Sequence, residues 1–142
     1  MQVWQHRRQV VEWLDEGGEA ELRFCKIILS ADEKNYHAWQ HRQWAVEKFK
    51  WVTVDLVKYH REFIFHVTLF HFSLYDGELP FVEELLDTDV RNNSAWNQRF
   101  FVVSHEVGDA MGEDVLQREL DFVEEKIKIV PSNESAWNYL RG

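Results

Sequence analysis

Four tryptophan-centred segments recur along the chain, and they constrain its fold more than any other feature. They read VWQHR at 3–7, AWQHR at 38–42, AWNQR at 95–99 and AWNYL at 136–140. The first three share Trp-x-x-Arg, a spacing that places both side chains on one face of a helix. An asparagine stands four residues before the last three tryptophans. A motif repeated in this way predicts a repeat architecture.

The intervals between the tryptophans indicate the size of the repeat. The interval from Trp4 to Trp39 is in the mid-thirties, and that from Trp96 to Trp137 is slightly above forty. A period in the mid-thirties is typical of a unit of two helices and two turns, as in tetratricopeptide arrays. The interval from Trp39 to Trp96 approaches sixty, which is too long for one such unit.

Helix signals agree with a two-helix unit. Asn35, and either Asn92 or Asn93, can cap tryptophan-bearing helices at about 35–49 and 93–106. Stripes of apolar residues at helical spacing indicate three partner helices: Leu22, Cys25, Ile28 and Leu29; Leu79, Val82, Leu85 and Leu86; and Leu116, Leu120, Val123, Ile127 and Val130. We therefore expect an all-α fold, a right-handed α-α superhelix of helical hairpins. It would be one partial domain over 1–142, with repeats at about 1–34, 35–91, 92–132 and an incomplete 133–142.

Residues 51–73 do not fit the repeat. This stretch holds three of the seven histidines and four of the ten phenylalanines. It includes an alternating, strand-like apolar run formed by Phe63, Phe65, Val67 and Leu69. Without it, the interval from Trp39 to Trp96 would return to the mid-thirties, so we interpret 51–73 as an insertion within the 35–91 repeat. Two origins stay open, a retained intron sequence and a genuine added helix that packs on the solenoid.

The net charge and the cysteine count limit which binding partners and which cellular compartment are expected. A net charge of −9 opposes binding to nucleic-acid phosphates. Cys25 is the sole cysteine, so no internal disulfide can form, and a cytoplasmic location is expected. The most apolar stretch, 63–73, is only about half as long as the roughly 20 residues that a membrane span needs. His60, His66 and His71 are six and five positions apart, a spacing that does not share a helical face, so no metal site is expected.

Other polar residues are assigned to solvent or to the core. The repeat tryptophans and arginines are expected to build the core of the solenoid. Ser104 and His105 are adjacent, but no acid is placed beside them, so a hydrolase triad is not supported. A solvated helix end is expected for the acidic residues Glu12, Asp15, Glu16, Glu19 and Glu21.

Three longer blocks carry a resemblance to a known family. They read KNYHAWQHRQW at 34–44, DVRNNSAWNQRFFV at 89–102 and PSNESAWNYL at 131–140. These blocks resemble the repeat of protein prenyltransferase α-subunits. Within that group, the chain is most similar to the α-subunit shared by farnesyltransferase and type I geranylgeranyltransferase, rather than to the Rab-specific subunit. The resemblance covers everything except 51–73.

The resemblance implies an enzyme that transfers farnesyl or geranylgeranyl from its diphosphate to the cysteine of a C-terminal CaaX motif. The α-subunit would form a crescent of helical hairpins around a β-subunit that binds the zinc. The holoenzyme would use zinc and magnesium, with no metal on this chain, which would be inactive without the β-subunit. The alternative is a non-catalytic tetratricopeptide-like scaffold, which would carry small residues at its helix crossings. The bulky aliphatic residues found here favour the prenyltransferase.

Compared position by position, the resemblance assigns three substrate-binding residues and no catalytic one. Gln2 matches a glutamine that contacts the terminal carboxylate of the substrate peptide, for which an amide NH₂ is a suitable donor. Tyr36 and His37 match residues near the isoprenoid diphosphate, and both can donate to phosphate oxygens. The family's diphosphate-assisting lysine would precede Met1, so a partial subunit is expected. Capping and ion pairing between repeats are expected of Lys34, Asn35 and Arg42.

Overall fold

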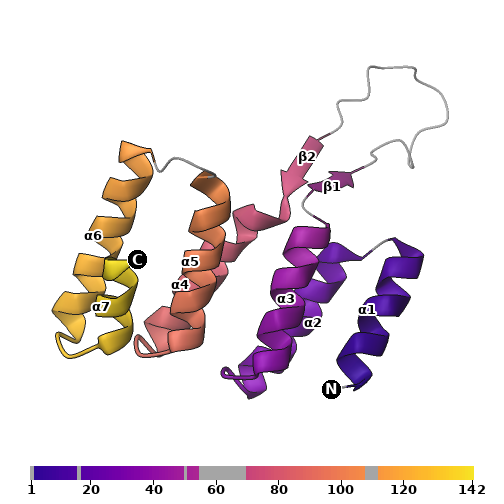
Figure 1. Ribbon diagram of the computed structural model, residues 1–142, viewed down its shortest axis with the longest axis horizontal. Coiled ribbons are helices and arrows are strands. Elements are labelled where there is room, and N and C mark those ends of the chain that lie inside the picture. The colour runs from indigo at the N-terminus through magenta and orange to yellow at the C-terminus, as the bar shows by residue number, and fades with distance from the viewer. Residues whose placement is uncertain (1, 16, 50, 55–69, 108–111) are drawn as a thin grey trace.

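The computed structural model describes residues 2–15, 17–49, 51–54, 70–107 and 112–142. Its helices follow one another as a row of antiparallel hairpins along the longest axis of the molecule (Figure 1). The helices are α1 (Gln2–Leu14), α2 (Gly18–Ala31), α3 (Tyr36–Lys48), α4 (Glu78–Thr88), α5 (Asn93–Val107), α6 (Glu113–Ile129) and α7 (Glu134–Arg141). The predicted all-α superhelix of helical hairpins is confirmed. In the part of the chain that the structure describes, no helix has the length and apolarity that crossing a membrane requires.

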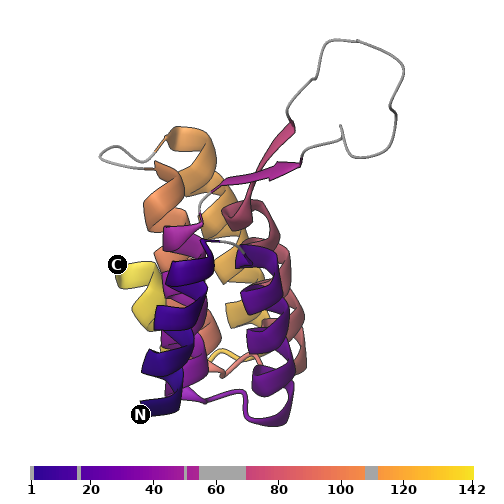
Figure 2. The ribbon, with the colours of Figure 1, turned by 90° about the vertical axis from the view of Figure 1, so that its right-hand side faces the viewer.

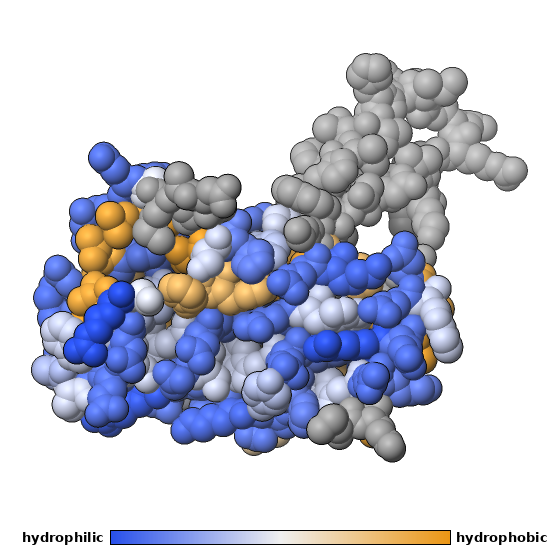
Figure 3. Space-filling model, in the orientation of Figure 1, coloured by the Kyte–Doolittle hydropathy of each residue, from blue (hydrophilic) through white to orange (hydrophobic). Residues whose placement is uncertain are grey.

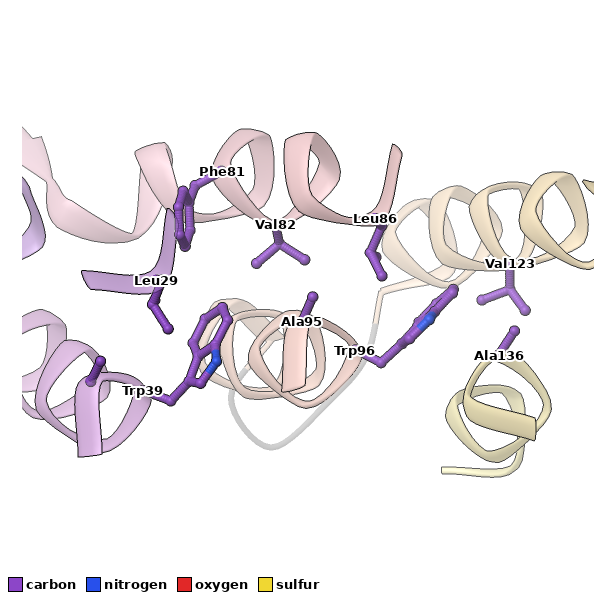
Figure 4. Packing of buried hydrophobic residues seen from close by; sticks show 10 residues of the cluster. Leu29, Trp39, Phe81, Val82, Leu86, Ala95, Trp96, Val123 and Ala136 are labelled. Atoms are coloured by element: carbon purple, nitrogen blue, oxygen red, sulfur yellow. The ribbon is translucent and has the colours of Figure 1, made fainter. Parts of the chain in front are cut away.

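The helices form two layers with the core between them. The tryptophan helices α1, α3, α5 and α7 contact one another in sequence order and make one layer. The partner helices α2, α4 and α6 make the other layer, in which ion pairs join α4 to both neighbours. Figure 4 shows side chains of the two layers meeting, with Val82 and Leu86 of α4 facing Ala95 and Trp96 of α5, and Phe81 of α4 lying toward Trp39 of α3. The hairpins therefore share one continuous core.

An asparagine cap starts each of the last three tryptophan helices. The cap residues are Asn35, Asn92 and Asn133, and each side chain accepts a hydrogen bond from a main-chain N–H two or three residues later. The indole Nε1 of each following tryptophan donates a 2.8 Å hydrogen bond to the carbonyl six residues before it: Trp39 to Glu33, Trp96 to Val90 and Trp137 to Pro131. The predicted caps are confirmed, with Asn92 rather than Asn93 in that role. The same local contacts thus fix the start of each helix and the direction of its tryptophan.

The predicted tryptophans and apolar stripes are largely buried, except in the last hairpin of the solenoid. Trp39 and Trp96 are buried, as predicted, whereas 40% of Trp137 is exposed. Leu116 was expected in the apolar stripe of its helix but is also exposed. Figure 3 shows hydrophobic residues gathered over α5 and α6 in this view. An apolar groove of about 220 Å³ lies there, lined by Phe100, Leu116 and Leu140 among others. The last described hairpin therefore presents an uncovered apolar face.

The ends of segment 51–73 pair with each other and not with the helices. Strand β1 (Trp51–Val54) is antiparallel to β2 (Phe70–Ser73), with Trp51 opposite Ser73. A 3-10 turn, η2 (Leu74–Gly77), then leads into α4. Figure 2 shows the two strands beyond the end of the helical layers. The alternating run 63–69 and the predicted added helix lie outside the described residues, as do the side chains of the three histidines.

This register predicts that the insertion can be removed without disturbing the solenoid. Paired residues of an antiparallel ladder lie only about 4.5–5.5 Å apart, so Trp51 and Ser73 are close together and deletion of 51–73 leaves only a short gap to close. We expect the deletion variant to keep its helical circular-dichroism signal per helical residue and to unfold within a few degrees of the parent chain. Loss of cooperative unfolding on deletion would show instead that 51–73 is an integral part of the fold.

Candidate functional site

The predicted substrate-binding residues lie at the starts of two neighbouring tryptophan helices. Gln2 is the first residue of α1, and Tyr36 and His37 are the first two residues of α3. Both helix starts lie at the same end of the molecule in Figures 1 and 2. Gln2 and His37 each precede a repeat tryptophan by two residues, so they occupy equivalent positions. The side chain of Gln2 lies outside the described residues, and its predicted role stays a prediction.

Tyr36 and His37 lie at the start of α3, where both side chains are at least partly accessible. Tyr36 is 65% exposed, and its hydroxyl oxygen accepts a 2.6 Å hydrogen bond from Nε2 of Gln40. The His37 ring lies edge-on to the Tyr36 ring, 5.7 Å between centroids, and is half-buried. Their donors, together with the partial positive charge of the helix start, suit an anionic ligand. Lys34 pairs weakly with the adjacent Glu33, at 3.9 Å, and with no other repeat among the residues that the structure describes.

No metal centre is formed by the residues that the structure describes. Among them, no three His, Cys, Asp or Glu side chains converge as metal ligands. The lone cysteine, Cys25, is fully buried, and this burial raises the pKa of its thiol to about 12. A thiol held protonated in this way is a poor nucleophile and a poor metal ligand, so Cys25 acts as a small core residue.

A buried glutamate on each partner helix joins consecutive hairpins. In the central example, Glu78 of α4 accepts two hydrogen bonds from the guanidinium of Arg42 on α3, at 2.9 and 2.7 Å. It accepts a third from Nε2 of Gln98 on α5, at 2.8 Å. All three residues are at most 4% exposed. We call this arrangement of arginine, glutamate and a second polar residue the glutamate clamp.

The clamp recurs at equivalent positions in the other two repeats. Its members there are Arg7, Glu21 and His41, with contacts of 2.6, 2.8 and 2.6 Å, and Arg99, Glu119 and Tyr139, with contacts of 2.6, 3.1 and 2.8 Å. Each guanidinium also lies over the phenylalanine three residues after the glutamate, 3.5 to 3.7 Å from the ring centroid: Phe24, Phe81 and Phe122. Such a cation–π contact adds to the pairing of the buried charge. Every clamp therefore ties one tryptophan helix to both helices of the next hairpin.

The clamp sets the geometry of the candidate site, because its first copy fixes α1 against α3. Arg7 of α1 and His41 of α3 bind the same Glu21 carboxylate. Arg8 also donates to the Gln40 carbonyl at 2.8 Å, and the Trp4 ring contacts the His41 ring. These contacts hold the starts of α1 and α3 side by side. The end that carries Gln2, Tyr36 and His37 is thus a rigid edge.

The prediction that Glu21 is solvated was wrong, because only 4% of this residue is exposed. The acidic run around it suggested a helix end in water, and the partner of its carboxylate lies 14 residues away. A signal was nonetheless present in the sequence. The same interval separates each clamp glutamate from the repeat tryptophan that follows it, and a phenylalanine always stands three positions after the glutamate. The predicted inter-repeat pairing of Arg42 and the capping role of Asn35 are confirmed.

In the clamps, burial and hydrogen bonding shift the pKa values of the ionisable side chains in opposite directions. Burial alone would raise the pKa of Glu119, but the hydrogen bonds from Arg99, Tyr139 and Arg118 outweigh it and lower that pKa. The pKa of Glu21 is lowered in the same way, by Arg7 and His41. Burial lowers the pKa of His41, and its bond to Glu21 only partly opposes this. Nδ1 of His41 has no hydrogen-bond partner among the described residues, which fits a neutral ring whose Nε2 donates to Glu21.

Comparison with known proteins decides the family. Residues 19–49, 75–106 and 116–142 match the model of the protein prenyltransferase alpha subunit repeat, which is more than half of the chain. The chain belongs to this family. The matched residues pair the tryptophan helices α3, α5 and α7 each with the helix before it, and 51–73 falls between two matches.

Individual relatives agree with that assignment. The chain is 38% identical, over 68 residues, to the protein farnesyltransferase/geranylgeranyltransferase type-1 subunit alpha of Dictyostelium discoideum. The match covers 48% of this chain and 21% of the relative. The chain is also 53% identical, over 30 residues, to the subunit of the same name from Arabidopsis thaliana. That match covers 21% of this chain and 9% of the relative.

A solved prenyltransferase extends the likeness to the whole fold. The match is to a chain of Candida albicans protein geranylgeranyltransferase-I complexed with GGPP, with a TM-score of 0.74 and 32% identity. It covers 99% of the present chain and 41% of the solved one. The prenyltransferase chain therefore contains the complete row of hairpins, and the present chain spans well under half of its length.

The neutral state of His41 predicts how stability changes with pH. An unfolded histidine has a pKa of about 6.5, above that of folded His41, so acid favours the unfolded chain as pH falls below that value. We expect His41→Gln, which copies the equivalent Gln98, to reduce the loss of unfolding free energy between pH 7 and pH 5. The measurement is urea unfolding at both pH values, with the exposed His6→Gln as the control. An equal loss in parent and His41→Gln would contradict a neutral His41.

Proposed function

We propose that this chain is a part of the α-subunit of a heterodimeric protein prenyltransferase, of the type shared by farnesyltransferase and type I geranylgeranyltransferase. The observation that carries the proposal is the likeness of the whole described solenoid to a chain of a solved geranylgeranyltransferase-I. The family match and the named subunits of the relatives support it. The chain would work in the cytoplasm, bound to a β-subunit.

In this proposal, the edge formed by the starts of α1 and α3 faces the substrates. The transfer forms a thioether bond between the cysteine of a CaaX protein and the isoprenoid, and it releases diphosphate. Negative charge therefore grows on the diphosphate as its bond to the isoprenoid breaks. The Tyr36 hydroxyl, the His37 imidazole and the N–H groups at the start of α3 would stabilise that charge. Gln2, at the start of α1, would donate to the carboxylate of the substrate peptide.

The remaining parts of the chemistry are assigned to the partner. Zinc activates the cysteine sulfur in a reaction of this kind by favouring its thiolate, and we place that zinc on the β-subunit. Magnesium, which neutralises phosphate oxygens, would also belong to the holoenzyme and not to this chain. The role left to this chain is to hold the Tyr36 and His37 donors and a helix start at a fixed edge. The clamps described above supply that rigidity.

The proposal is tested by co-expression with a farnesyltransferase β-subunit and, separately, with a type I geranylgeranyltransferase β-subunit. We expect the chain to co-elute with at least one of them in size-exclusion chromatography. We also expect the complex to bind a fluorescent isoprenoid diphosphate. Tyr36→Phe and His37→Ala should each weaken that binding roughly ten- to one-hundredfold, because each removes a hydrogen bond to a charged group.

Matched controls are available at the opposite end of the tryptophan helices. Tyr75→Phe and His105→Ala remove the same groups from the cluster where Tyr75 stacks on His105, and they should leave binding unchanged. Co-elution with neither β-subunit would contradict the pairing and favour the scaffold alternative. Co-elution with unchanged diphosphate binding by the Tyr36 and His37 variants would refute only the assigned site.

A further inference from the structure

The hydroxyl of Tyr36 is hydrogen-bonded to a residue one helical turn further along α3. Nε2 of Gln40 donates to the Tyr36 oxygen at 2.6 Å. Residues four apart lie on the same face of a helix, and both residues are exposed. Gln40 therefore lies beside the candidate anion site, although it is not one of the residues predicted to bind the substrate.

The direction of this hydrogen bond determines what the Tyr36 hydroxyl can do. An amide NH₂ can only donate, whereas a phenol hydroxyl can both donate its proton and accept. Because the Tyr36 oxygen accepts from Gln40, the hydroxyl proton points away from Gln40. A hydroxyl that accepts one hydrogen bond is also polarised into a stronger donor. The Tyr36 proton is thus available to a further acceptor, such as an anionic ligand at the start of α3.

Gln40 also limits where the Tyr36 ring can lie. The ring meets the His37 ring edge-on, with centroids 5.7 Å apart, and its hydroxyl is bonded to Gln40. The main chain of Gln40 is held in turn, because its carbonyl accepts a 2.8 Å hydrogen bond from Arg8 of α1. Tyr36 is therefore fixed at both its ring and its hydroxyl. A side chain held in this way loses less conformational freedom when a ligand binds.

The stacking of the hairpins does not account for this pair, because the pair does not recur with the repeat. The residues three before and one after each repeat tryptophan are Met1 and Gln5, Tyr36 and Gln40, Asn93 and Asn97, and Glu134 and Asn138. A carboxamide recurs at the second position, but a tyrosine stands at the first position in one repeat alone. The arginine and glutamate of the clamp, by contrast, are present in all three clamps. The tyrosine–carboxamide pair is thus a feature of the candidate site and not of the repeat.

We propose that Gln40 is a positioning residue for the prenyl transfer, whose amide directs the Tyr36 hydroxyl proton toward the isoprenoid diphosphate. This inference rests on the proposed function, because it takes Tyr36 as a donor to the diphosphate. Gln40 acts through Tyr36, by holding the ring and by occupying the acceptor side of its oxygen. The effect grows when the bound substrates exclude water from this edge, because a hydrogen bond is electrostatically stronger away from water.

The test is a double-mutant cycle on the complex with the β-subunit that co-elutes. Gln40→Met removes the amide and keeps the length of the side chain. It should raise the dissociation constant for a fluorescent isoprenoid diphosphate roughly three- to tenfold, as expected for one lost hydrogen bond. In the Tyr36→Phe background the same substitution should have no effect, because no hydroxyl is left to position. Asn97→Met, at the equivalent exposed position of α5, is the matched control and should bind as the parent does.

Gln40→Glu tests the direction of the hydroxyl proton. A carboxylate of the same size can only accept, so it would take the Tyr36 proton and should weaken binding more than Gln40→Met does. The added charge also repels the diphosphate, and Gln40→Glu in the Tyr36→Phe background measures that repulsion by itself. Equal losses by Gln40→Glu in the two backgrounds would contradict the proposed direction. Thermal unfolding of each free chain checks that every variant is folded.

The outcomes separate this inference from the proposal beneath it. Unchanged binding by Gln40→Met, with binding weakened by Tyr36→Phe, would refute the positioning role and leave the site intact. An equal loss by Gln40→Met with and without the Tyr36 hydroxyl would show a direct contact or a general structural role, and would refute the inference as well. Absence of diphosphate binding by the parent complex would overturn both the inference and the assigned site.

Discussion

The glutamate clamp is the interaction on which the rest of this structure depends. A buried carboxylate or guanidinium is costly unless its partners satisfy it completely, and removing one partner is strongly destabilising. Glu78 meets that condition only when the hairpin α4/α5 docks on α3, because Arg42 and Gln98 come from helices on either side of it. The clamps therefore favour the correct stacking of hairpins over any slipped arrangement. Apolar burial alone would tolerate such slips more readily.

The position of the candidate edge and the tolerance of the insertion both follow from this geometry. The clamp on Glu21 holds α1 and α3 together, so the helix starts that carry Gln2, Tyr36 and His37 form one edge. The segment 51–73 can be accommodated because its flanking strands pair with each other, while the clamp between Arg42 and Glu78 closes the gap in the solenoid.

Local signals could be read from the sequence, and distant pairings could not. The helix predicted at 35–49 is observed at Tyr36–Lys48, because a cap, a tryptophan and an apolar stripe are features of neighbouring residues. The clamp arginines that pair with Glu21, Glu78 and Glu119 lie 14 to 36 residues away, and an acidic side chain near a turn looks solvated when considered alone. The residues of the candidate site were predicted from the family resemblance and not from a local pattern. The structure adds the exposed position of Tyr36 and the rigid edge, which no local pattern contains.

The most direct test of this account is a double-mutant cycle across the central clamp. Arg42→Met, Glu78→Gln and the double variant would be compared by urea unfolding, with the exposed pair Glu124 and Lys128 carried through the same cycle. We expect a coupling free energy of about 2–3 kcal/mol for Arg42 and Glu78, and below about 1 kcal/mol for the exposed pair. Additive effects of Arg42→Met and Glu78→Gln would contradict the claim that the clamp holds the hairpins together.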